Sequence, residues 1–304
     1  KYEIENVNPL GRSGTVDIDI SKYISEFIDI NLTSNSTTSL NDANSLVWVK
    51  TEVIYYINGV AQSPEFVQID SAVKGYGYAM EGINPTTPNN KYLATQIEQK
   101  VSRNGVYIFS FLASETESTV IKLNDLTLTK TSSTNSPDII QSVYVKVDEF
   151  EEDYIEIYKD DVLMTTLLVT DEPSYEPLDI AFINKEGQLQ TITFFKEITC
   201  TLNVTRESFE SSSGQPINGV HQFKNYNVNG RESFSVNSGF VKEDNNELFT
   251  QLLLSEKVWN LKNNVYIPLN VGSETIEYKT RKRDRLINYK IDFKYSFNKI
   301  NRIW

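Results

Sequence analysis

Polar and apolar residues alternate with a period of two along much of this sequence, and this pattern constrains the fold more than any other feature. The longest alternating run covers residues 287–295, and the residues in these runs are mostly β-branched and aromatic. Shorter runs cover 15–20, 142–147, 154–158, 190–195 and 233–236. Successive side chains of a strand point to opposite faces, so this period predicts half-buried β-strands rather than amphipathic helices. We therefore expect a mainly β protein.

Glycine-containing turn signals separate the predicted strands. Asn-Gly pairs at 58–59, 104–105 and 229–230 predict two-residue hairpin turns, because both residue types tolerate positive φ. Glu186-Gly187 predicts a further hairpin that joins 178–183 to 189–195. Short strands with turns every 8–12 residues or so are typical of sandwiches and barrels. We expect two or three antiparallel β-sandwich or barrel-like domains.

One segment has helical spacing. Asp244 and Glu247 form a capping-box pattern, in which an acidic residue follows the N-cap by three positions. Apolar residues then recur with the period of a helix, at Leu248, Phe249, Leu252 and Leu253. We expect a short helix near residues 244–256, packed on the C-terminal sheet. Segment 23–30 is compatible with either a helix or a strand.

Composition along the chain suggests three parts. The polar, turn-rich segment 131–137 is typical of a linker, and 31–44 and 211–216 are typical of exposed loops. We expect an N-terminal β domain over 1–130, a middle β segment or linker over 131–175, and a C-terminal β domain over 176–304. The middle segment is free to belong to either neighbour.

Several functions are excluded by residue types that are scarce. The 304 residues include one cysteine, so no intrachain disulfide can form, and one histidine, so no site with two histidine ligands can form within a chain. No apolar run reaches the roughly 18 residues needed to cross a bilayer. With 41 acidic and 29 basic residues the net charge is −12. Since binding phosphates needs an excess of basic residues, we expect neither nucleic acid nor membrane as a partner.

No residues are arranged for catalysis. His221 has no acidic residue nearby in the sequence to orient it, and Cys200 is expected to be a small buried hydrophobic residue. The densest acidic run, 148–153, is typical of a solvated loop; paired carboxylates for glycoside hydrolysis and a calcium site are the alternatives. Neither glycine-rich nucleotide-binding motif occurs. We expect no catalytic residues, no metal ligands and no cofactor.

The end of the chain is unusually basic. Residues 279–304 contain nine basic and two acidic side chains, so this segment carries +7 and the rest of the chain −19. We predict that this basic segment contacts an acidic patch on a neighbouring subunit, a complementarity that sets orientation; a solvated strand face is the alternative. The residues predicted at this interface are Lys279, Arg281, Lys282, Arg283 and Arg285.

Aromatic residues suggest an alternative function. The run 75–78 alternates glycine and tyrosine, which favours a tight edge or bend in a sheet. Tyr76, Tyr78 and Trp48 would instead stack on sugar rings if they were exposed. That reading predicts a carbohydrate-binding adhesin or receptor-binding module that recognises a host surface glycan, whereas core packing is the competing interpretation.

The C-terminal region carries a family resemblance. Its distinctive parts are the Asn-Lys-x-Gly turn at 184–187 with the aromatic strand after it, and the Leu-Leu-Leu-Ser-Glu helix end at 252–256. Further matching segments are 177–183, 193–196, 223–230, 257–259, 266–271, 278–280 and 286–303. Residues 175–304 resemble uncharacterised structural proteins of tailed phages that infect Bacteroidetes and related marine bacteria. The N-terminal part fits more loosely, through 17–21 and 82–84.

The resemblance implies a non-enzymatic virion component of the tail, baseplate or neck, and it brings no catalytic motif. The expected partners are other copies of the chain, in a ring or tube, and other virion tail proteins. Such a protein assembles in the host bacterial cytoplasm, and the lack of disulfides fits that reducing compartment.

Overall fold

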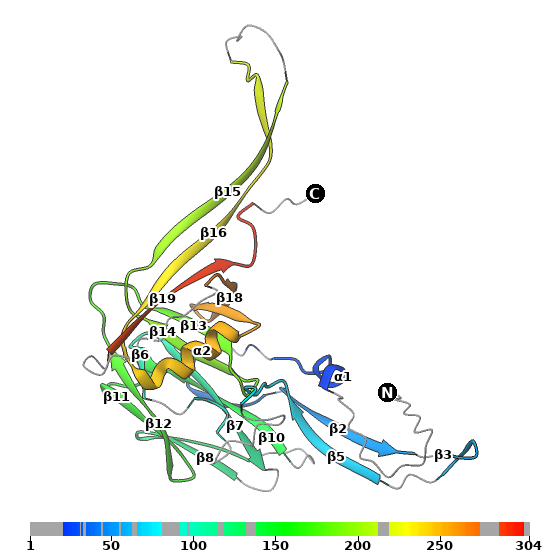
Figure 1. Ribbon diagram of the computed structural model, residues 1–304. Helices are drawn as coiled ribbons and strands as arrows, with labels where there is room; N and C mark the ends of the chain where they lie inside the picture. Colours follow the sequence, from blue (N-terminus) through cyan, green and yellow to red (C-terminus); the bar gives the residue numbers. More distant parts are fainter. Residues whose placement is uncertain are drawn as a thin grey trace.

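The computed structural model describes residues 21–30, 32, 35–43, 45–54, 56–62, 66–80, 92–95, 98–114, 118–131, 138–211, 219–273 and 286–300. With 59% of the described residues in strands, it confirms the predicted mainly β fold with several antiparallel sheets. Figure 1 shows a layered body from which two long strands extend as an arm. The predicted strand at 15–20 and residues 82–84 lie outside the described residues.

Two sheets form a β-sandwich. The smaller contains, in order, β1 (Ser39–Ala43), β10 (Asp138–Lys146) and β7 (Val106–Ser114). The larger contains, in order, β6 (Gln99–Ser102), β12 (Val162–Thr170), β11 (Tyr154–Lys159), β8 (Ser118–Leu123) and β9 (Leu126–Thr131). All these strands pair antiparallel except β6 with β12. Most of the predicted middle segment therefore pairs with strands that precede it in the chain, and β1 lies in a segment predicted to be a loop.

A seven-stranded sheet forms the next layer. Its order is β14 (Leu189–Phe194), β13 (Leu178–Ile183), β17 (Val258–Lys262), β18 (Val265–Val271), β19 (Leu286–Tyr295), β16 (Phe223–Lys242) and β15 (Thr199–Glu210). Helix α2 (Asn246–Leu254) covers one face of this sheet. Phe249 of the helix packs against Phe194 and Tyr289, with ring centroids 6.2 and 4.7 Å apart. This confirms a short helix on the C-terminal sheet.

Strand β7 belongs to two cores because its side chains alternate between two faces. Tyr107 and Phe109 point into the sandwich core, whereas Val106 and Ile108 pack with Ala181 and other residues of the seven-stranded sheet. The backbone N–H of Ile108 also donates a hydrogen bond to Thr191 Oγ1 at 3.1 Å. The three-stranded sheet is thus the middle layer of the body.

A smaller unit is formed by segments on both sides of β1 in the chain. It consists of α1 (Ser21–Ser25), the pair β2 (Leu46–Val53) and β5 (Phe66–Val73), and the pair β3 (Tyr56–Ile57) and β4 (Val60–Ala61). Two hydrogen bonds attach it to the turn between β13 and β14. Ser45 Oγ donates to Gln188 Oε1 at 2.7 Å, and the Tyr76 N–H donates to the Lys185 carbonyl at 2.7 Å.

Two of the four predicted hairpin turns are confirmed. Asn58 and Gly59 have φ values of 51° and 78° between β3 and β4, and Gly187 has φ 73° between β13 and β14. The prediction at 104–105 is wrong, because β6 and β7 belong to different sheets. The prediction at 229–230 is also wrong, because β16 runs through both residues without turning.

The predicted capping box is wrong as well. Helix α2 begins after Asn245, whose side chain makes no capping hydrogen bond. Glu247 instead accepts hydrogen bonds from the Tyr78 hydroxyl at 2.9 Å and from Gln251 Nε2 at 2.8 Å. The Glu247 carboxylate, which the sequence pattern predicted to cap the helix, is therefore used in hydrogen bonds to Tyr78 and Gln251 instead.

Candidate functional site

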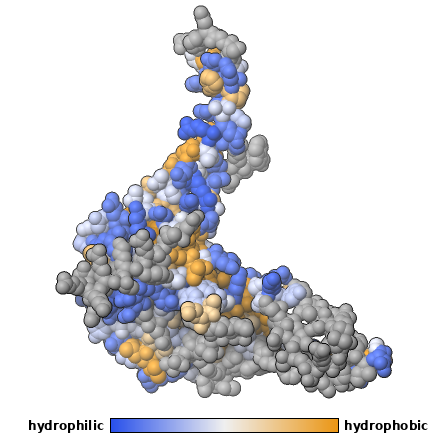
Figure 2. Space-filling view, viewed as in Figure 1, coloured by the Kyte–Doolittle hydropathy of each residue, from blue (hydrophilic) through white to orange (hydrophobic). Residues whose placement is uncertain are grey.

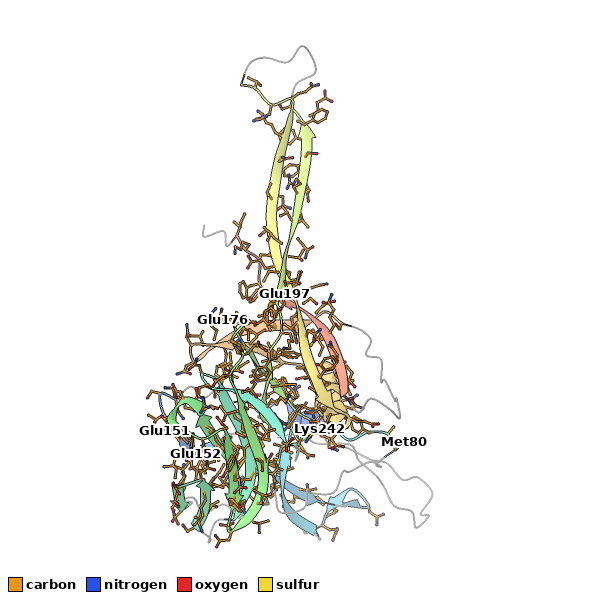
Figure 3. All side chains as sticks on the ribbon, turned by 90° about the vertical axis from the view of Figure 1, so that its left-hand side faces the viewer. Met80, Glu151, Glu152, Glu176, Glu197 and Lys242 are labelled. Atoms are coloured by element: carbon orange, nitrogen blue, oxygen red, sulfur yellow. The ribbon has the colours of Figure 1, made fainter. Side chains whose placement is uncertain are left out.

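Strand β15 and the outer half of β16 leave the body together, and we call Thr199–Glu210 with Phe223–Ser235 the arm (Figure 1). The two segments pair antiparallel from Thr199 opposite Ser235 to Glu210 opposite Phe223. Figure 3 shows Glu197 where the arm meets the body and side chains projecting from both strands above it. The predicted loop 211–216 would connect the strands at the outer end, but 212–218 lie outside the described residues.

The arm exposes apolar side chains to solvent. All twelve residues of β15 are exposed, including Leu202 at 52% and Phe209 at 48%. On β16, Phe223 and Tyr226 are exposed as well. Figure 2 shows hydrophobic residues interspersed among hydrophilic ones along the arm. An isolated two-stranded hairpin is only marginally stable in water. The arm would therefore be stabilised by packing against another protein.

A bulge and a glycine shape the arm. The register shifts between Thr205 and Glu207, where β16 contains one extra residue, and Asn227 there has φ 49°. Asparagine tolerates this left-handed conformation, and a bulge increases the local twist. Below the bulge, a Cβ at Gly230 would lie 3.0 Å from Leu202 Cδ1. Asn229-Gly230 therefore makes room for a cross-strand side chain.

The base of the arm is anchored by the segment after β19. The Lys299 N–H donates to the Gly230 carbonyl at 2.6 Å, and Lys299 Nζ forms an ion pair with Glu232 at 2.5 Å. Arg231 Nε donates to the Tyr295 carbonyl. These contacts end at the base, so the outer part of the arm is held by β15–β16 pairing alone within the part of the chain that the structure describes.

The outer edge of β15 is open. This strand stands last in the seven-stranded sheet, and among the described residues no strand pairs with its second edge. The opposite end differs, since β14 is buried throughout and packs beside β7. An open edge presents unpaired backbone N–H and C=O groups that another strand can bind.

Charged residues gather in the outer half of β15. Glu207 accepts a hydrogen bond from Asn227 Nδ2 at 3.2 Å, and hydrogen bonding to Glu207 together with its charge raises the pKa of Tyr226. Glu210 accepts from Gln222 Nε2 at 2.9 Å. Arg206 makes no ion pair with any residue that the structure describes.

The predicted basic interface cannot be placed on this surface. Lys279, Arg281, Lys282, Arg283 and Arg285 all lie outside the described residues. Contact between this segment and an acidic patch therefore stays a prediction. Reversing Arg281, Lys282 and Arg283 to Glu should weaken assembly at low salt, and an unchanged oligomer would contradict it.

The three aromatic residues of the predicted glycan site lie in the smaller unit and the segment after it. Trp48 is half-buried in β2, opposite Ser71 of β5. Tyr76 and Tyr78 follow β5 and pack edge to face, with centroids 6.1 Å apart. Lys185 lies 5.3 Å over the Tyr78 ring, and burial raises the pKa of Tyr76 to about 12, with smaller contributions from nearby carboxylates. Both tyrosines thus contribute to internal packing, and glycan binding stays a prediction.

The candidate catalytic residues are not brought together. Cys200 is exposed at the base of β15, so the expectation of a buried cysteine is wrong. Its neighbours in β15 are exposed too, so both faces of this strand are uncovered. His221 is exposed near the outer end of the arm, where its carbonyl accepts a hydrogen bond from Ser211 Oγ at 3.0 Å.

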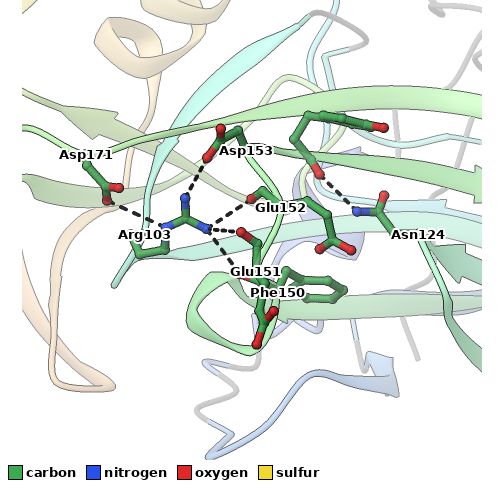
Figure 4. Close-up of polar contacts among 8 residues, drawn as sticks. Arg103, Asn124, Phe150, Glu151, Glu152, Asp153 and Asp171 are labelled. Carbon is green, nitrogen blue, oxygen red and sulfur yellow. Dashed lines mark hydrogen bonds and ion pairs between the residues drawn. The ribbon is translucent and has the colours of Figure 1, made fainter.

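The acidic run 148–153 wraps around an arginine. Arg103 Nη1 donates to the carbonyls of Phe150, Glu151 and Glu152 at 3.0–3.2 Å, and Nη2 donates to Asp153 Oδ1 at 2.9 Å (Figure 4). The run therefore closes a loop over one guanidinium group. Within the described ranges, no group of three or more acidic, cysteine or histidine side chains is arranged to bind a metal ion.

One carboxylate lies partly buried between the layers. Burial raises the pKa of Asp179, in β13, to about 6, and this rise is partly offset by hydrogen bonds from Thr193 Oγ1 at 2.5 Å and the Val106 N–H at 3.2 Å. A Cβ at Gly105 would lie 2.8 Å from Asp179 Oδ2. Its two hydrogen bonds and the close approach of Gly105 fit a structural role.

Sequence reasoning missed the arm. The alternating run at 233–236 and the alternation around Cys200 indicated strand only at the base of the arm. The Asn-Gly pair at 229–230 wrongly predicted a turn in the middle of β16. No helix among the described residues has the length and apolarity to span a membrane. No protein-family model, curated protein or solved structure matches this chain.

Proposed function

We propose that this chain is a non-enzymatic structural subunit of a tailed-phage virion, in the tail or baseplate, and that it acts through interfaces with other subunits. The arm is the observation that carries this proposal. The sequence resemblance of residues 175–304 adds to it, because that region contains the seven-stranded sheet and the arm. The virion is then the site of action, and other copies of the chain are the first partners.

The energetics of the arm favour assembly. Full burial of an exposed Leu or Phe side chain contributes roughly 1.5–3 kcal/mol. Leu202, Phe209, Phe223 and Tyr226 are each about half exposed or more, so a neighbour that covered them would stabilise both itself and the arm. Such a gain is available only in a complex, which is the property expected of a building block.

Shortening the arm tests the proposal. Residues 206–228 are replaced with an Asn-Gly turn, which joins Thr205 directly to its partner Asn229 and keeps the anchoring contacts of Gly230. We expect the full chain to form defined oligomers by light scattering and electron microscopy, and the shortened chain to remain monomeric with unchanged thermal stability.

Point variants provide a matched control. Leu202→Ser and Phe209→Ser on the arm should weaken the oligomer, whereas Val60→Ser and Val265→Ser change comparably exposed residues elsewhere, at 63% and 58%, and should not. A full chain that stays monomeric at every concentration and is absent from purified particles would overturn the proposal.

A further inference from the structure

The open edge of β15 can pair with itself. When two copies of one strand pair antiparallel about a twofold axis perpendicular to the sheet, facing residues lie on the same side of the sheet. Residues on one side of a strand are separated by an even number of positions. Facing partners must therefore also differ by an even number. The extra residue of the bulge lies on β16, so alternation along β15 continues through the register shift.

The requirement that facing residues differ by an even number of positions leaves one register in which Arg206 faces an acidic residue of β15. The acidic residues of β15 are Glu207 and Glu210. Glu207 lies on the opposite side of the strand from Arg206, whereas Glu210 lies on the same side. An axis at Ser208 places each Arg206 opposite Glu210 of the second copy. In this register the two copies form two equivalent ion pairs between Arg206 and Glu210, and opposite charges on facing residues are favourable.

The same axis brings apolar groups together on the other side of the strand. There Glu207 faces Phe209 of the second copy, and the two Phe209 rings become diagonal neighbours, at a spacing that aromatic side chains can bridge. Each Phe209 already packs against Tyr226 of its own chain at 5.7 Å. The axis thus joins two aromatic pairs into one cluster that covers side chains now exposed.

We propose that β15 pairs antiparallel with β15 of a second copy, in the register centred on Ser208, and so joins two seven-stranded sheets into one continuous sheet. This inference rests on the proposed assembly function and names its partner and geometry. The arm stands clear of the body in two perpendicular views, which leaves this edge accessible (Figures 1 and 3).

Crosslinking tests the register. In a Cys200→Ser background, Ser208→Cys places two cysteines directly opposite each other, within the Cα separation of about 4.5–5.5 Å that suits a disulfide. Mild oxidation of the full chain should give a covalent dimer. Thr205→Cys is the matched control, because its two copies would lie about 20 Å apart in this register and should not crosslink.

Charge reversal tests the ion pairs. Arg206→Glu or Glu210→Arg alone should weaken the dimer about tenfold or more, since each puts like charges opposite each other twice. The double variant should restore dimerisation. Lys224→Glu, on the neighbouring strand, should have little effect.

The outcomes separate this inference from the function on which it rests. Absence of the Ser208→Cys crosslink, crosslinking at Thr205→Cys instead, or failure of the double charge reversal to restore the dimer would overturn the register. If shortening the arm still abolishes oligomers in that case, the assembly function stands. A chain that is monomeric with its arm intact would overturn both.

Discussion

Asp179 of β13 accepts a hydrogen bond from the backbone N–H of Val106 in β7, across the boundary between the seven-stranded sheet and the middle layer. The donor and acceptor are 3.2 Å apart, and the carboxylate is partly buried. A charge buried with only neutral donors is costly, so burial raises the pKa of this group from 3.8 to about 6. The joint between the two layers is therefore sensitive to pH.

Removing this charge should flatten the pH dependence of stability. Between about pH 4 and 6 the folded protein keeps a proton on Asp179 that the unfolded chain loses, so this contribution to stability is full at low pH and is lost as pH rises to 6. The difference corresponds to about 3 kcal/mol. In Asp179→Asn the amide oxygen can accept from the Val106 N–H while the amide nitrogen donates to Thr193 Oγ1, which reverses the direction of one bond. The variant should be more stable than the parent above pH 6.

Denaturant unfolding of the parent, Asp179→Asn and the exposed control Asp125→Asn from pH 4 to 7 measures this effect. The control should follow the parent at every pH. Parallel curves for the parent and Asp179→Asn would contradict the assignment.

The contact between the smaller unit and the body depends on glycine at 187. A Cβ there would lie 2.4 Å from the Lys74 carbonyl oxygen, and φ is 73°. Gly187→Ala should lower the free energy of unfolding by about 2–4 kcal/mol, since backbone atoms must move. Gly59→Ala has a similar φ of 78° but no neighbour within 4 Å, and should cost about 1 kcal/mol. Equal losses in chemical denaturation would show that the close approach contributes nothing.

Arg103 should be irreplaceable by lysine. Its guanidinium reaches three carbonyls of the acidic run together with Asp153, and a single ammonium cannot match this geometry. Arg103→Lys should lower the free energy of unfolding by about 1–3 kcal/mol. Arg206→Lys, measured at low protein concentration, changes an exposed arginine of the arm and should stay within about 0.5 kcal/mol of the parent. Similar losses of unfolding free energy in the two variants would rule out the predicted role of the hydrogen bonds between Arg103 and residues 150–153.

Glu247 should act through tertiary contacts rather than as a helix cap. Glu247→Ala removes the acceptor for Tyr78 and Gln251, and should lower the free energy of unfolding by about 1–2 kcal/mol. Glu243→Ala removes an exposed carboxylate just before the same helix and controls for its charge. The prediction fails if thermal unfolding shows the two variants to be equally destabilised.

Local patterns in the sequence were sufficient for several strands, the helix and two turns. The alternation at 142–147, 154–158 and 190–195 predicted β10, β11 and β14, although β14 proved to be buried on both faces rather than half-buried. Asn58-Gly59 and Gly187 predicted turns because positive φ is a property of the residue itself. The spacing of Leu248, Phe249 and Leu252 likewise predicted α2.

Tertiary structure decided which strands share a sheet and which surface is free. Asn229-Gly230 has the chemistry of a turn, yet it lies within β16, where both residues pair with β15 and Leu202 packs close to the glycine. Cys200 has the alternation of a buried strand, yet it is exposed because neither face of β15 is covered by the body. Burial and edge position depend on contacts between residues far apart in the chain. The alternation of residues within one segment therefore cannot predict either property. The arm, where the proposed assembly function lies, therefore became visible only in three dimensions.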